Sequence, residues 1–113
     1  MLLSTLSFSD VTAGNREQKK DSQAVISCKV NGLTKVLDGV KWTKSDDTEL
    51  TSGVENFVID TGSGSFSGDT QTTTLTVPAS QTDVDKTYNC VITSNEHGGT
   101  EKSTAVNLKV FSE

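Results

Sequence analysis

The chain has 113 residues, a length that suits one domain with a single hydrophobic core and is too short for two. Its ten basic and fifteen acidic side chains give a net charge of −5, and the only basic doublet is Lys19-Lys20, so we expect no nucleic-acid partner. The 32% of apolar and 5% of aromatic residues are few for a helical bundle. They suffice for a thin β-sandwich, in which each strand buries alternate residues.

The sequence contains no segment that would cross a membrane. No apolar run approaches the roughly 20 residues that a spanning helix needs. Met1-Leu2-Leu3 is too short for the apolar core of a signal peptide and has no basic residue before it. We therefore expect residues 1–113 to form a single domain excised from a larger protein, with no direct membrane contact of its own.

Alternation of apolar and polar residues predicts a series of short strands. In chain order they are an edge strand headed by Leu6 and Phe8, residues 24–30, a strand around Val40 and Trp42, residues 55–60, residues 72–77, a strand with Tyr88, Cys90 and Ile92 inward, and a last one with Val106, Leu108 and Val110 inward. Asn31-Gly32 predicts a turn after the second strand, and Pro78 ends the strand over 72–77. This series predicts an all-β fold.

The connections between these strands are polar and rich in glycine. A polar stretch over 13–21 follows the first strand, and Asp46-Asp47 lie in a polar turn after the third. Residues 61–69 contain three glycines and three serines around the lone Phe66. Gly98-Gly99 are the glycine pair that a tight hairpin between the last two strands requires.

Cys28, Trp42 and the segment Tyr88-Asn89-Cys90 form the most informative pattern in the chain. With these residues the sequence resembles an immunoglobulin-superfamily domain. The resemblance implies an immunoglobulin-like Greek-key sandwich of two antiparallel sheets, in which Trp42 packs against a Cys28–Cys90 disulfide and Tyr88 hydrogen-bonds to backbone upstream. The strand predictions place both cysteines inward, which favours the same bridge.

The resemblance extends from Leu6 to Val110 and is greatest to the intermediate and variable-like sets, between which the sequence does not decide. It departs from them at two positions. Val84 stands where an acidic residue is usual, six residues before Cys90. Asn95 lies one position further from Cys90 than is usual, which predicts a bulge or a longer hairpin.

Residue patterns for catalysis or metal binding are absent from the sequence. His97 is the only histidine, so a site with two histidine ligands is impossible. Asp46-Asp47 with Glu49 lack the spacing of a calcium loop, and no nucleophile elbow or phosphate-binding loop occurs. We therefore expect no enzyme activity, no metal and no cofactor.

Protein binding is the function that such a sandwich favours, and its loops are the usual site. The candidate binding residues are Leu33, Val36, Leu37, Asp46, Asp47, Phe66, Asn95, Glu96 and His97. We expect the loops around 31–38, 46–47 and 94–99 to gather at related ends of the sandwich. Phe66, Leu33, Val36 and Leu37 either cover the core or offer apolar contacts, and a sheet face is the alternative site.

The leading hypothesis is a non-enzymatic protein-binding module of an extracellular cell-adhesion or recognition receptor. Its partner is a protein, with homophilic binding left open, and its parent protein is expected to be membrane-anchored at the cell surface. A disulfide would require an oxidising compartment. Two alternatives stay open. The first is a structural module with reduced cysteines in an intracellular filament-associated protein, and the second is a secreted immune-type recognition protein.

Overall fold

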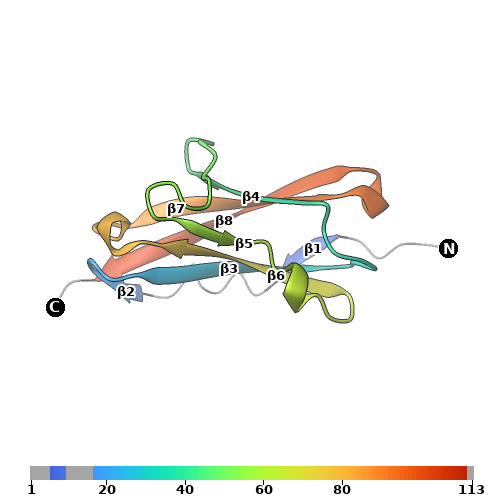
Figure 1. The fold of residues 1–113 in the computed structure, drawn as a ribbon, viewed down its shortest axis with the longest axis horizontal. Coiled ribbons are helices and arrows are strands. Elements are labelled where there is room, and N and C mark those ends of the chain that lie inside the picture. Colours follow the sequence, from blue (N-terminus) through green and yellow to red (C-terminus); the bar gives the residue numbers. More distant parts are fainter. Residues whose placement is uncertain (1–5, 10–16, 112–113) are drawn as a thin grey trace.

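The computed structural model describes residues 6–9 and 17–111, which form two β-sheets packed face to face (Figure 1). The strands are β1 (Ser7–Ser9), β2 (Glu17–Lys19), β3 (Ala24–Asn31), β4 (Gly39–Lys44), β5 (Val58–Asp60), β6 (Thr70–Val77), β7 (Lys86–Ser94) and β8 (Thr100–Phe111). Short 3-10 turns are η2 (Ser63–Ser65), η3 (Ala79–Gln81) and η4 (Asn95–His97). None of these turns is long or apolar enough to cross a membrane.

The described strands pair in the orders β1-β3-β6-β5 and β2-β8-β7-β4, with four strands in each sheet. This arrangement confirms the predicted all-β sandwich. The pairings are antiparallel except that of β2 with β8, which is parallel. The first strand of the sandwich is thus divided between the sheets, since β1 joins one and β2 the other.

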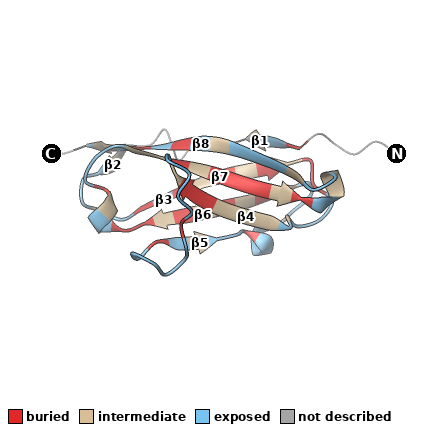
Figure 2. Cartoon of the chain, turned by 90° about the horizontal axis from the view of Figure 1, so that it is seen from above, coloured by how far each residue is buried: buried red, intermediate tan, exposed pale blue. Residues whose placement is uncertain are grey.

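Alternate residues of the long central strands fill the space between the sheets. β3 pairs with β6 from Ala24 opposite Val77 to Asn31 opposite Thr70, and both strands bury every second side chain. Figure 2 shows the buried residues in red along the strands and the exposed ones in pale blue mainly in loops and turns. The inward positions predicted from alternation on β3, β6, β7 and β8 are buried or, at Val110, half-buried.

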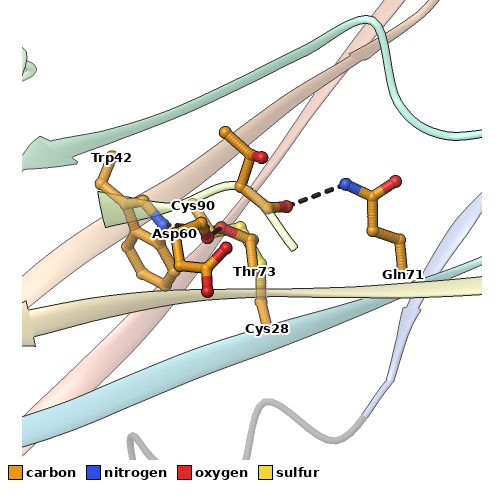
Figure 3. The surroundings of a disulfide bond; sticks show 7 residues. Cys28, Trp42, Asp60, Gln71, Thr73 and Cys90 are labelled. Carbon is orange, nitrogen blue, oxygen red and sulfur yellow. Dashed lines mark hydrogen bonds between the residues drawn. A yellow bond between two sulfur atoms is a disulfide. The ribbon is translucent and has the colours of Figure 1, made fainter. Parts of the chain in front are cut away.

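A covalent bond and a buried hydrogen-bond chain join the sheets at the centre of the core (Figure 3). Cys28 of β3 is bonded to Cys90 of β7, and Trp42 of β4 lies opposite Cys90 in the strand register. The Trp42 indole Nε1 donates to the Thr73 hydroxyl at 3.2 Å, and that hydroxyl donates to the Asp60 carbonyl at 2.6 Å. The indole N–H therefore keeps a partner although the ring is fully buried.

Two strand predictions differ from the structure. The strand predicted over 55–60 begins only at Val58, because Glu55 and Asn56 have φ angles of 54° and 66° in a turn. The polar stretch over 13–21 contains the undetected strand β2, which is held by backbone pairing to β8 and has no apolar face to reveal it.

Tyr88 is buried, but its role differs from the predicted one. Its ring packs edge-on against Phe57 with the centroids 6.1 Å apart. Among the described residues its hydroxyl forms no hydrogen bond, so the predicted bond to upstream backbone is not formed there. Burial, followed by the charge of Asp83, raises the pKa of the Tyr88 phenol to about 12, so the hydroxyl stays protonated.

We expect replacement of both Cys28 and Cys90 by alanine to lower the free energy of unfolding by about 4 kcal/mol, because the bridge closes a long loop in the unfolded chain. Urea denaturation of the variant measures the loss, and the wild-type domain held in a strong reductant is the matched control. A loss below about 1 kcal/mol in both samples would show that the bridge contributes little.

Candidate functional site

Three loops meet at one end of the sandwich, which we call the loop end and define as residues 32–38, 61–69 and 94–99 (right-hand side of Figure 1). The strand registers bring these loops together. Asn31 at the end of β3 lies opposite Thr70 at the start of β6, and Gly39 of β4 lies opposite Thr93 of β7. A backbone bond of 2.9 Å from Leu33 to Asp69 joins the first two loops directly.

Two carboxylates lock the loop over 32–38 to the turn η4. The Glu96 carboxylate accepts hydrogen bonds from the backbone N–H of Thr34 at 3.0 and 3.1 Å, from that of Lys35 at 3.4 Å, and from the Thr34 hydroxyl. In the opposite direction the Asn95 backbone N–H donates to Asp38 Oδ1 at 2.7 Å. We call these five residues the carboxylate latch.

The hydrogen bonds that Glu96 accepts within the latch stabilise its ionised form. Desolvation is the largest single influence on this carboxyl and opposes ionisation. The bonds from the side chain and backbone of Thr34 and from the backbone of Lys35, with the nearby His97, together outweigh it and hold the pKa of Glu96 below its usual range. Glu96 is therefore ionised at neutral pH and accepts the hydrogen bonds of the latch in that form.

The turn that carries Glu96 has a fixed local geometry. His97 Nδ1 lies 2.8 Å from the Ser94 hydroxyl, and the His97 carbonyl accepts from the Thr100 hydroxyl. Gly98 and Gly99 both have a φ of 76°, a conformation that glycine adopts without strain. The β7–β8 pairing is regular up to Ser94 opposite Thr100, so the longer hairpin, rather than a bulge, accommodates Asn95.

A buried amide ties the loop over 61–69 to the same structure. Gln71 is only 1% exposed; its Oε1 accepts from the Leu37 backbone N–H at 2.8 Å and its Nε2 donates to the Thr61 carbonyl at 2.8 Å. Figure 3 shows the latter bond beside the disulfide. One side chain of β6 thus holds two of the three loops against the core.

The apolar candidate residues divide between core and surface. Leu33 is 2% exposed, and the half-buried Leu37 and Phe66 pack against the core. Val36 differs, because it is 42% exposed and lies beside the exposed Lys35. Val36 is therefore the apolar contact that the loop over 32–38 presents to solvent.

Asp46 and Asp47 lie away from the loop end, in the turn that follows β4 (left-hand half of Figure 1). β4 runs six residues from the loop end to this turn, a length of about 16 Å. Hydrogen bonds from Thr48 to the Asp46 carboxylate, opposed by desolvation, hold the pKa of Asp46 below its usual range. The expectation that this turn joins the other loops is wrong, since β4 separates them.

Sequence reasoning missed Thr34, Asp38 and Gln71, which hold the loop end together. Thr34 and Asp38 are exposed polar residues in a loop, and their partners lie 62 and 57 positions away. Gln71 carried a usable signal, because it occupies an inward position in the alternation of β6. A polar residue at such a position requires buried hydrogen-bond partners.

The two packed sheets, the disulfide between them and the buried tryptophan at the centre are the features of an immunoglobulin-like β-sandwich. No model of a known protein family matches the chain, and no curated protein matches it. In the described parts of the chain, no group of three or more His, Cys, Asp or Glu side chains is placed to hold a metal ion.

Protonation of Glu96 is expected to open the carboxylate latch. Because the folded-state pKa is lowered, the latch stabilises the fold above the pKa of free glutamate, about 4.3, and this contribution is lost as the pH falls through the folded value. An NMR titration of the Glu96 carboxyl carbon should give a midpoint below that of free glutamate, and Thr34→Val should raise it. A wild-type midpoint at or above about 4.3 would contradict the latch.

Loss of the Gln71 amide is expected to destabilise the domain. Gln71→Leu should lower the free energy of unfolding by roughly 2 kcal/mol, because it leaves the Leu37 N–H and the Thr61 carbonyl without their partner. Thr74→Ala on the outer side of the same strand is the control, with an expected change within about 0.5 kcal/mol. Equal losses in urea denaturation of both variants would show that the two bonds contribute nothing.

Proposed function

We propose that this domain is a non-enzymatic recognition module of the immunoglobulin superfamily that binds a protein partner through its loop end. The observation that supports this proposal is the carboxylate latch. It joins loops from different strands into one surface by direct contacts between Glu96 and Thr34 and between Asp38 and Asn95. Loops carried in this way by a rigid scaffold are the usual place for binding residues.

A surface that is ordered before binding favours affinity. Ordering a flexible loop in a complex costs free energy, and this cost falls when the loop is already held in the free protein. Here the latch and Gln71 hold the loops, and the exposed Val36 and Lys35 remain available for contact. Protein interfaces usually have an apolar centre that is surrounded by polar residues, and Val36 beside Lys35 fits this arrangement.

The polar side chains of the turn η4 support binding rather than catalysis. The Ser94 hydroxyl and His97 Nδ1 are neighbours, but Ser94 is 1% exposed and so is not presented to a substrate. Glu96 is occupied by the amides of Thr34 and Lys35. We therefore assign these groups to holding the turn.

The Cys28–Cys90 disulfide suggests an oxidising compartment, and we propose that the parent protein is exposed at the cell surface. Within that setting, cell adhesion and immune-type recognition both fit a loop-end binding site. An intracellular filament module is the less favoured reading, because its cysteines would be reduced.

A matched pair of exposed valines tests the proposed site. Tetramers of the domain are screened against an array of purified ectodomains from the same organism, this domain included. We expect Val36→Asp at the loop end to weaken any captured interaction by about tenfold or more, since a charge at a buried contact costs over 1 kcal/mol. Val84→Asp is the control, because Val84 is 56% exposed and lies two residues before β7, far from the loop end.

The thermal midpoints of both variants should equal that of the wild type, since both side chains are exposed. Binding that survives Val36→Asp and fails in Val84→Asp would place the site at the opposite end. Equal loss in the two variants would contradict a localised loop-end site.

A further inference from the structure

A second candidate site lies at the end of the sandwich opposite the loop end. It is a pocket of about 750 Å³ between the start of β7, the end of β8 and the turn after β4. Its volume lies within the range of pockets that hold small ligands. None of the residues from the proposed loop-end surface lines it, so it stands independently of the proposed function.

The strand register explains why the pocket exists. The β4–β7 pairing ends at Lys44 opposite Tyr88, whereas β7 starts two residues earlier. Lys86 and Thr87 therefore pair only with β8 among the described strands and leave the other edge of β7 uncovered. An uncovered strand edge can pair with an extended peptide.

Basic side chains predominate among the charged residues of the lining. Lys44, Lys86 and Lys109 line the pocket against one carboxylate, Asp85, so three of the ten basic residues of an acidic chain meet there. Asp85 is already engaged, since its Oδ1 accepts from the Val110 N–H at 2.7 Å. The pocket thus has a local excess of positive charge.

Several hydrogen-bond donors of the lining have no partner among the described residues. Lys86 is held by Asp83 at 3.2 Å and by Gln81 at 3.1 Å, but the ammonium groups of Lys44 and Lys109 form no ion pair with a described residue. The Tyr88 hydroxyl adds a protonated donor.

Asn107 contributes a further donor to the same pocket. Its Oδ1 accepts from the Thr87 hydroxyl at 2.9 Å, which leaves the amide nitrogen able to donate. Apart from the Asp85 carboxylate, of which Oδ1 is bonded, the groups named here without a partner are the two ammonium groups and the neutral donors of Tyr88 and Asn107. This combination matches a ligand that carries negatively charged acceptor oxygens.

We propose that this pocket binds a carboxylate of an acidic peptide segment that lies extended along the free edge of β7. Lys44 and Lys109 supply the charge, the Tyr88 hydroxyl and the Asn107 amide donate hydrogen bonds, and the uncovered edge at Lys86 and Thr87 pairs with the peptide backbone.

Titration of the ¹⁵N-labelled domain with acetylated, amidated tri-glutamate tests the proposal. We expect saturable NMR shifts centred on the amides of Lys86 to Tyr88 and Asn107 to Lys109, and none with tri-glutamine of the same length. Shifts of equal size with tri-glutamine, or no saturable shift with tri-glutamate, would overturn it.

Two charge-matched double variants and one further ligand complete the test. K44Q/K109Q should weaken tri-glutamate binding about threefold to tenfold, as expected for two partly exposed ion pairs, whereas K29Q/K41Q, on strand positions outside the pocket, should leave it unchanged. Unchanged affinity in K44Q/K109Q would overturn the proposal. Glucuronate that binds the same amides more tightly than tri-glutamate would also overturn it, in favour of an acidic saccharide.

Discussion

The covalent bond between Cys28 and Cys90, with Trp42 packed beside it, fixes how the two sheets face each other. β3 and β7 belong to different sheets, and the loop over 32–38 and the turn η4 follow directly from them. Because the disulfide joins β3 and β7 near their centres, the carboxyl ends of the two strands lie level with each other at the loop end. The short hydrogen bonds of the carboxylate latch depend on that alignment.

Two buried polar side chains of β6 extend the same constraint to the third loop. Thr73 and Gln71 point inward from β6, two residues apart, and bond respectively to the carbonyls of Asp60 and Thr61. The chain leaving β5 is thereby held near the disulfide while Gln71 also holds Leu37. Core and loop end form one continuous set of interactions, so a change in the core is expected to reach the surface.

Much of the fold could be predicted from sequence because alternation reports burial directly. The strands over 24–30 and 72–77, with Thr73, Leu75 and Val77 inward, follow from side chains that alternate between core and solvent. β2 could not be found in this way, since its residues Glu17 to Lys19 are all polar and its pairing with β8 is made by the backbone. The left-handed conformations of Glu55 and Asn56 likewise have no apolar pattern.

The candidate site was predictable only in part. Glycines marked the hairpin and placed Asn95, Glu96 and His97 in a turn, but no periodicity relates Glu96 to Thr34, which is 62 positions away. From their apolar character alone, the loop residues Leu33 and Val36 could lie either in the core or on the surface. Only the packing shows that Val36 is exposed and Leu33 is buried. Contacts between distant loops depend on the register of the paired strands, and the pattern of residues along the chain does not determine that register.

Binding through the proposed surface depends on a loop end that is ordered in the free domain. The most direct test is the backbone ¹⁵N order parameter of residues 32–38 and 94–99 at neutral pH, measured without a partner. We expect values of about 0.8 or more, close to those of the flanking strands β3 and β7. Values below about 0.6 in both loops would contradict it, because the carboxylate latch would then be open in solution.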